Sequence, residues 1–196
     1  MARDPGVRRE AILGSAAALF ANKGVAATTV RQIADEVGIL SGSLYHHFDS
    51  KEGMVDEIMS AYLEDLQTRF RHVLARATDP RQRVHNLVVA SLEVVEAHPH
   101  AAEIYQNDVN YLLQFERFAY LKNAGEEVRN TWLQVIEEGI AQGAFRGDLD
   151  AKILHRLMRD AVWLSVRWFT PSADYTITHL ADDCTSLFLD GLTTAR

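Results

Sequence analysis

Small and polar side chains gather in one short stretch, residues 28–51, which reads TTVRQIADEVGILSGSLYHHFDSK. Apolar residues at helical spacing on both sides of Gly38 predict two short helices. Two short helices joined by a glycine turn are typical of a helix-turn-helix. The second helix of that motif lies in the major groove of DNA. Its first residues are small, so the backbone at Gly42 can come close to a base. The hydroxyls of Ser41 and Ser43 can donate to or accept from base edges and phosphates.

Larger side chains in the same stretch carry groups that contact phosphates. Tyr45 has a rigid ring with a terminal hydroxyl, and His46 and His47 add ring N–H donors. Lys51 brings a positive charge to the start of the next predicted helix. The residue types leave alternatives open, namely a packing role for Tyr45 and for one of the histidines, and an ordinary solvated Lys51. Together these side chains predict a surface that contacts DNA.

A second set of side chains with binding chemistry lies in the helix predicted over residues 152–170. At about 100° per residue, five of its side chains project within one stripe. They are Lys152, Arg156, Arg159, Trp163 and Arg167. Arginine binds phosphate bidentately and tryptophan stacks on flat rings, so the stripe suits a long anionic ligand. The alternative is a solvated face whose arginines pair with nearby aspartates.

Aromatic residues between positions 105 and 132 form a third candidate site. They are Tyr105, Tyr111, Phe115, Phe118, Tyr120 and Trp132. Aromatic residues at helical spacing most often pack in a core, whereas some line an apolar cavity that takes a ring system. The sequence leaves both roles open for each of them.

Helix signals that position these side chains run through the whole chain, and no alternating strand pattern of useful length appears. Gly24 and Gly38 mark predicted helix ends, Asp79–Pro80 predicts a helix start, and Asp148 or Asp150 is the expected cap of the helix that carries the basic stripe. The expected fold is therefore all-α. It consists of an N-terminal three-helix domain with a helix-turn-helix and a C-terminal helical domain for ligand binding and dimerisation.

The last predicted helix, residues 175–194, has one continuous apolar stripe. Its members are Ile177, Leu180, Ala181, Cys184, Leu187, Phe188 and Gly191. With the apolar side of the preceding helix, this stripe predicts a dimer interface built as a four-helix bundle. Packing within the chain is the alternative use of the same stripe.

Composition and charge exclude several classes of protein. The chain has 196 residues and a single cysteine, so neither an intrachain disulfide nor a thiolate zinc site is expected. Residues 1–51 carry six Lys or Arg against five Asp or Glu, whereas residues 52–196 carry 14 against 22. A nucleic-acid reader on a larger acidic body fits this asymmetry. We expect a cytoplasmic protein without a signal peptide, a membrane span or a metal, and no motif predicts an enzyme.

The residues of the helix-turn-helix also resemble a known signature. Thr28–Ala34, Val37–Gly38, Leu44–Phe48 and Lys51–Glu52 look like the signature of TetR-family transcriptional regulators. The resemblance implies a DNA-binding domain over residues 1–51 and an effector-binding and dimerisation domain over 52–196. It also implies a homodimer that binds a palindromic double-stranded operator and leaves it when a small molecule binds.

The same resemblance implies phosphate contacts from Thr28, Tyr45 and Lys51 and base contacts from Ser41 to His46. The recognition helix has few long side chains, so we expect DNA shape, Arg31 and the N-terminal arm with Arg3, Arg8 and Arg9 to contribute. The predicted DNA-binding residues are Thr28, Thr29, Arg31, Ser41, Gly42, Ser43, Tyr45, His46 and Lys51.

The body of the chain is similar to a narrower branch, the actinobacterial regulators of cholesterol ring degradation. That similarity implies no cofactor, and an effector that is a coenzyme A thioester of a partly degraded steroid ring. The predicted effector-binding residues are Arg159, Trp163, Arg156, Arg167, Tyr105, Tyr111, Phe115 and Trp132. The alternatives are a repressor that senses a neutral hydrophobic drug or lipid and, outside this class, a helical-bundle enzyme or carrier.

Overall fold

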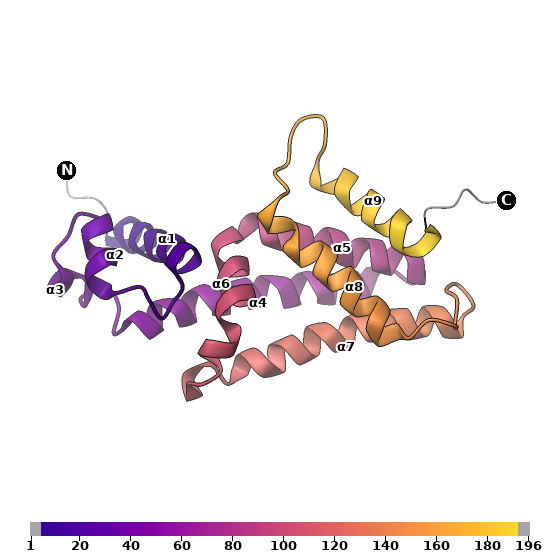
Figure 1. The fold of residues 1–196 in the computed structure, drawn as a ribbon, viewed down its shortest axis with the longest axis horizontal. Helices are drawn as coiled ribbons and strands as arrows, with labels where there is room; N and C mark the ends of the chain where they lie inside the picture. Colours follow the sequence, from indigo (N-terminus) through magenta and orange to yellow (C-terminus); the bar gives the residue numbers. More distant parts are fainter. Residues whose placement is uncertain (1–4, 192–196) are drawn as a thin grey trace. The chain divides into compact units, whose positions relative to one another are not determined.

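The computed structural model describes residues 5–191, and all regular secondary structure within them is helical, which confirms the all-α prediction. Figure 1 shows how the helices follow one another along the chain. The elements are α1 (Pro5–Lys23), α2 (Val30–Glu36), α3 (Ser41–Leu44), α4 (Lys51–Arg76), α5 (Pro80–Ala97), α6 (Pro99–Leu112), η1 (Glu116–Phe118), α7 (Tyr120–Ala141), α8 (Ala151–Trp163), η2 (Leu164–Arg167) and α9 (Ile177–Asp190).

The helix ends follow from local side-chain chemistry. Gly24 and Gly38 have φ angles of 83° and 67°, a backbone that only glycine adopts without strain, directly after α1 and α2. The side chain of Thr29 accepts a hydrogen bond from the Gln32 backbone N–H and begins α2. Asp150 in turn accepts from the first backbone N–H groups of α8, which decides between the two caps that the sequence left open.

The chain divides into two compact units. The first contains the residues up to Leu63 together with His98–Leu121, and the second contains Glu64–Ala97 together with the chain from Lys122 onward. Helix α4 therefore supplies its first half to one unit and its second half to the other. The division of function at residues 51 and 52 stays a prediction.

The core of the first unit is built from the apolar faces of its helices. The buried apolar residues on α1 to α3 and on the turn after α3 are Ile12, Ala16, Ala17, Phe20, Ile33, Ala34, Leu44 and Phe48. Arg9 donates to both carboxylate oxygens of Glu57, at 2.6 and 2.5 Å, and its guanidinium lies 4.4 Å from the centre of the Phe48 ring. These contacts hold α1 against the start of α4.

Helix α5 is the central element of the second unit. It packs on α8, η2 and α9, and half of its residues are buried. The side chain of Arg69 links α4 to α5, because it binds Asp65 at 2.9 Å and Glu93 at 2.5 Å. Within residues 5–191, no helix is both long and apolar enough to cross a membrane.

The prediction of one continuous helix over residues 152–170 is wrong. The α-helix ends at Trp163 and continues as the tighter 3-10 turn η2. The buried hydroxyl of Ser165 donates to the Val162 carbonyl at 2.6 Å, and such a bond competes with the regular helical pattern. Arg167 therefore lies on η2 and does not continue the stripe of α8. The last helix is also shorter than predicted: α9 ends at Asp190, and Thr194 lies outside the described residues.

Candidate functional site

The recognition helix predicted over residues 41–47 is present only as the short helix α3, which ends at Leu44, and Tyr45 to His47 follow it in a turn. Most of the side chains that were expected to contact DNA are accessible to solvent. Leu44 is fully buried and anchors α3 to the first unit. Tyr45 is 56% exposed, His46 and Gly42 are exposed, and Ser41 is half-buried. Ser43, on the same helix, is half-buried as well. Most of the residues that were predicted to contact bases are thus accessible to solvent, which a contact with DNA requires.

The two threonines before α2 have different roles. Thr28 is buried, and its hydroxyl donates to the Gly24 carbonyl at 2.8 Å. This geometry does not support the predicted phosphate contact from the Thr28 side chain, because the hydroxyl instead closes the turn between α1 and α2. Thr29 is exposed at the start of α2, and Arg31 projects with 85% of its side chain exposed. Thr29 and Arg31 remain accessible to DNA.

Lys51 is tied into the same turn. Its ammonium donates to the carbonyls of Val25 at 2.8 Å and of Thr28 at 3.1 Å. An ammonium has three N–H donors, so one remains for a phosphate. The sequence missed this structural role because neither carbonyl is near Lys51 in the chain. Arg3, in the predicted N-terminal arm, lies outside the described residues, and Arg9 is engaged with Glu57.

Replacing Lys51 should therefore weaken the fold as well as DNA binding. Lys51→Met keeps most of the stem and leaves two carbonyls without their donor, so we expect the free energy of unfolding to fall by about 1–3 kcal/mol. Urea unfolding measures this loss, with Lys23→Met, at an exposed position in the same unit, as the control. An unfolding free energy equal to that of the wild type would show that the two bonds contribute nothing.

The predicted basic stripe is only partly formed. Arg156 and Arg159 are exposed on α8, and Trp163, at the end of the same helix, is half-buried. Arg159 donates to Asp160 from Nε at 2.9 Å and from Nη2 at 2.6 Å. Lys152 is exposed on the same helix, so the stripe is an accessible surface on α8 that reaches from Lys152 to Trp163. One of its arginines is already paired.

The predicted aromatic residues belong to both units. Tyr105, Tyr111 and Phe115 are part of the first unit, where the rings of Tyr111 and Phe115 meet edge to face with centres 5.2 Å apart. Trp132 is fully buried in the second unit, and its ring lies 6.3 Å from that of Phe70. Among these aromatic residues, Trp132 is the one that shares a unit with the stripe of α8.

His155 is the functional candidate that the sequence analysis missed. It is 4% exposed, and its ring lies 6.3 Å from the ring of Trp132. Burial, together with the positive charges of Arg159 and Arg129, lowers the pKa of His155 to about 4. Its spacing from the buried Met158 and Val162 could have indicated an inward-facing position. The sequence-based prediction for this helix rested instead on the charged residues of the basic stripe.

The depressed pKa of His155 predicts a loss of stability in mild acid. Because the unfolded chain binds a proton near pH 6.5 and the folded chain only near pH 4, the stabilisation is complete above pH 6.5 and is lost as the pH falls toward 4. The shift corresponds to at most about 3 kcal/mol. Urea unfolding at several pH values should show a shallower dependence for His155→Phe than for the wild type. Identical profiles would contradict the assignment.

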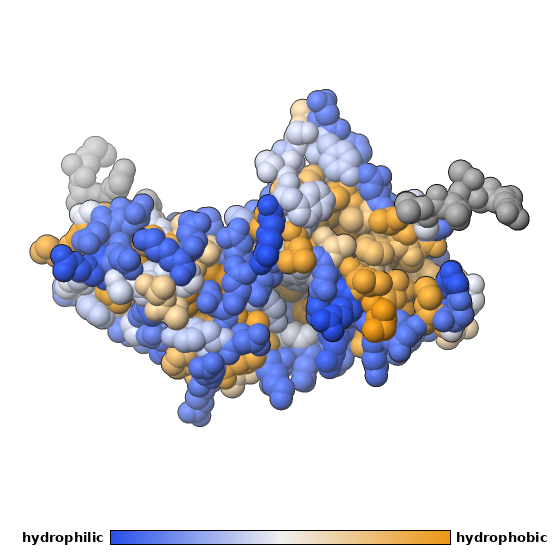
Figure 2. Space-filling view, in the orientation of Figure 1, coloured by the Kyte–Doolittle hydropathy of each residue, from blue (hydrophilic) through white to orange (hydrophobic). Residues whose placement is uncertain are grey.

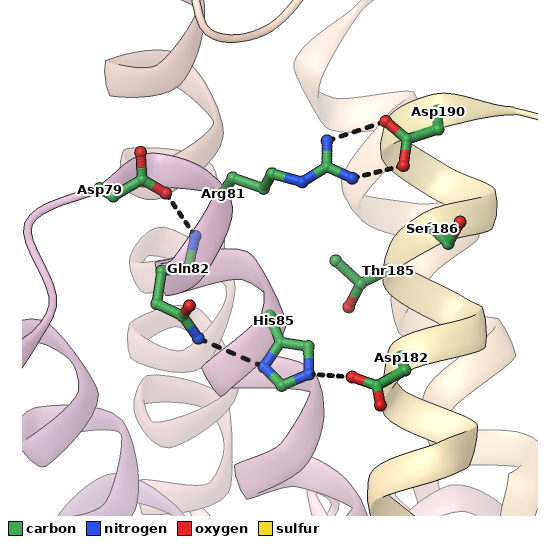
Figure 3. A pocket seen from close by; sticks show the side chains of 8 residues that line it. All are labelled: Asp79, Arg81, Gln82, His85, Asp182, Thr185, Ser186 and Asp190. Carbon is green, nitrogen blue, oxygen red and sulfur yellow. Dashed lines mark hydrogen bonds and ion pairs between the residues drawn. The ribbon is translucent and has the colours of Figure 1, made fainter. Parts of the chain in front are cut away.

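A polar pocket of about 270 Å³ lies between α5 and α9 (Figure 3). Arg81 donates to both carboxylate oxygens of Asp190, with an Nη1–Oδ1 distance of 2.9 Å, and the imidazole of His85 lies 2.8 Å from Asp182. These pairs join α9 to α5. The charged groups that line the pocket already have hydrogen-bond partners, since Asp79 accepts from the backbone N–H of Gln82, so the pocket does not resemble a site for an apolar ring.

An apolar surface is exposed along α8, η2 and α9, and Figure 2 shows hydrophobic residues gathered in this region. Its members, named here the apolar α8–α9 surface, are Ile153, Leu157, Leu164, Trp168 and Leu187, which are 40–65% exposed. The apolar stripe that was predicted for the last helix serves two purposes. Leu180 and Ala181 are buried within the chain, whereas Leu187 is exposed and is part of the apolar α8–α9 surface. Among the described residues, no cluster of His, Cys, Asp or Glu could hold a metal ion.

Comparison with known proteins gives consistent matches over both units. Residues 12–58 match the bacterial regulatory proteins of the tetR family, and residues 77–192 match the tetracyclin repressor-like C-terminal domain. The HTH-type transcriptional repressor KstR2 of Rhodococcus jostii (strain RHA1) is 46% identical over 185 residues, which cover 94% of this chain and 91% of that protein.

Two solved structures extend the comparison. The ketosteroid transcriptional regulator KstR2 of Mycobacterium tuberculosis has a TM-score of 0.88 and 40% identity, covering 100% of this chain and 98% of that one. AibR in complex with isovaleryl coenzyme A and operator DNA has a TM-score of 0.77 at 20% identity, covering 92% and 97%. The second likeness shows a shared fold alone.

Proposed function

The chain belongs to the tetR family of bacterial regulatory proteins, and from this premise we propose that it is a repressor that binds operator DNA as a homodimer and is released by a coenzyme A thioester from steroid-ring catabolism. The observation that carries the proposal is the similarity over nearly the whole chain to repressors named KstR2, one of them described as a ketosteroid regulator. The same proposal places the protein in the bacterial cytoplasm, where operator DNA lies.

The exposed surface of α3 supports the DNA-binding part of the proposal. Two copies related by a two-fold axis would place two such helices in successive major grooves, one helical turn apart, which requires a palindromic operator. Ser41, Gly42, Ser43 and His46 would face the bases. The Tyr45 hydroxyl and the remaining N–H of Lys51 would contact phosphates.

Removing the Tyr45 side chain should weaken operator binding. Tyr45 is exposed, so Tyr45→Ala removes a phosphate contact and the ring without opening the core, and we expect about a tenfold loss of affinity. Gel-shift titration with operator DNA measures the loss, and Tyr175→Ala, in the second unit, is the control. Tyr45→Phe separates the hydroxyl from the ring. Unchanged affinity in Tyr45→Ala would exclude this contact.

The apolar α8–α9 surface supports the proposed homodimer. Exposed apolar residues that lie together on a soluble protein commonly mark an association surface. A two-fold axis brings the same surface of two copies together, so α8 and α9 of each copy would form a four-helix bundle. This arrangement would also set the spacing of the two α3 helices on the operator.

The exposed arginines of α8 support a thioester as the effector. The anionic phosphates of coenzyme A need cationic partners that keep solvent access, and Arg156 and Arg159 provide them on one helix. Trp163 ends the same helix and would pack against a flat portion of the ligand. A retained acyl-CoA in native mass spectrometry of the freshly purified protein would support this class directly, whereas a retained neutral lipid would favour the alternative effector.

A further inference from the structure

Two polar atoms on neighbouring buried rings of the second unit have no hydrogen-bond partner among the described residues. They are Nε1 of Trp132 on α7 and Nε2 of His155 on α8. Trp132 is 0% and His155 is 4% exposed, and their rings lie 6.3 Å apart at an angle of 48°. Folded proteins rarely leave buried polar atoms unsatisfied, so this pair points to a group from outside the chain that completes it.

The surroundings of the pair are apolar. The ring of Phe70 packs edge to face on Trp132, and Met158 and Val162 are buried on the same face of α8 as His155. The charged groups that act on His155 are Arg159 and Asp160 of α8 and Arg129 of α7. None of these three is buried with the pair, because Arg129 is exposed and the side chains of Arg159 and Asp160 are 46% and 47% exposed.

This environment fits an uncharged group. The pKa of His155 lies at about 4, so its ring is neutral at neutral pH, and the indole is neutral as well. A carboxylate or phosphate placed here would be desolvated without a buried cation to compensate its charge. The anionic part of a coenzyme A thioester is therefore excluded from this place, and a neutral oxygen on an apolar ring is not.

We propose that Trp132 and His155 recognise a ketone or hydroxyl oxygen on the ring portion of the effector. This inference rests on the proposed function as an effector-released repressor. The indole N–H donates to the oxygen, and the imidazole Nε2 either donates to a ketone or accepts from a hydroxyl, according to its tautomer. An oxygen placed within reach of both nitrogens would complete both buried atoms, while the exposed arginines of α8 would hold the charged end of the ligand.

The consequence is selectivity for oxygenated rings. A site whose buried polar atoms are completed by the ligand rejects an analogue that lacks the oxygen, because that analogue leaves both atoms unpaired. We therefore expect the intact dimer to bind an oxygenated effector at least about tenfold more tightly than its deoxygenated counterpart. Ring shape and apolar area are the same in the two ligands and do not produce this difference.

The test uses a matched pair of probes, the coenzyme A thioester of a fused bicyclic carboxylic acid with one ring ketone and the same thioester without the ketone. Calorimetry on the full-length protein gives the two dissociation constants. In the nitrogen-15 NMR spectrum, the Trp132 indole N–H proton should move downfield with the ketone probe, because a new hydrogen bond deshields it, and should show no such downfield move with the other. The chain has three tryptophans, so Trp163→Phe and Trp168→Phe assign the third signal by elimination.

Variants test which side chains cause the preference for the ketone probe. Trp132→Phe and His155→Phe each remove one polar atom and should bring the ratio of the two dissociation constants toward one. Phe70→Leu, in the same cluster without a polar atom, should weaken both probes alike and preserve the ratio. If a variant does not fold, the wild-type ratio and the Trp132 signal decide the question.

The outcomes separate this inference from the proposed function. Equal binding of the two probes by the wild type, or an unmoved Trp132 signal with the ketone probe bound, overturns the inference and leaves the thioester effector standing. If neither probe binds, the proposed effector class is wrong and the inference falls with it. A ratio of at least tenfold that is lost in both polar variants and kept in Phe70→Leu supports it.

Discussion

Leu157→Glu should convert the protein into a monomer that binds operator DNA at least about a hundredfold more weakly. Leu157 lies at the middle of α8 and is 60% exposed, so the substitution does not disturb the core of its own chain. In the proposed four-helix bundle it would place two carboxylates near the two-fold axis without partners, which costs several kcal/mol. The loss of operator affinity follows because linked half-site binding gains a factor of about 10²–10⁴ over one half-site alone.

Analytical ultracentrifugation measures the oligomeric state and gel-shift titration measures the operator affinity of the same samples. Lys152→Glu is the control, since it adds negative charge at an exposed polar position of the same helix. A Leu157→Glu protein that stays dimeric would place the dimer interface elsewhere. A wild-type protein that is monomeric at micromolar concentration would remove the reason for the interface altogether.

Arg159→Met and Trp163→Leu should each raise the acyl-CoA concentration needed for operator release by about ten- to a hundredfold. The two residues stand at i and i+4 on α8 and are neighbours on its surface. In Arg159, Nε and Nη2 bind Asp160, so Nη1 has no hydrogen bond among the described residues and is available to a phosphate. Trp163 would pack against the flat part of the ligand.

Titration of the preformed operator complex with a steroid-ring acyl-CoA measures this effect. Both variants should bind operator like the wild type when no effector is present, because neither residue lies in the first unit. Arg156→Met is the matched control and should change the release concentration less, since it lies one turn further from Trp163. If both variants release operator DNA at the acyl-CoA concentration that the wild type needs, the stripe is an ordinary solvated face.

The helix ends were predictable because their causes are local. Gly24 and Gly38 take a backbone that other residues avoid, and Asp150 and Thr176 accept from N–H groups within a few residues. The end of α8 was not predictable in this way. Its apolar periodicity continues past Trp163, and only the burial of the Ser165 hydroxyl shows why the backbone tightens there.

The sequence was sufficient to predict which residues make up the candidate site, but not whether their side chains point into the protein or toward solvent. The sequence placed Thr28 and Lys51 in the helix-turn-helix, yet their polar groups turn inward to carbonyls that follow α1. Burial of a hydroxyl or an ammonium depends on what packs around it, which spacing does not specify. His155 was missed for the converse reason: a titratable residue between Lys152 and Arg156 suggests a solvated face, and only packing on Trp132 shows that it is buried.

Release of operator DNA by a defined effector tests the central claim most directly. The purified protein bound to its operator would be titrated with the coenzyme A thioester of a steroid-ring acid, with the free acid and with coenzyme A alone. We expect the thioester to release the DNA at a concentration at which the free acid and coenzyme A do not. A complex that survives the thioester but dissociates with a neutral steroid or drug would contradict it.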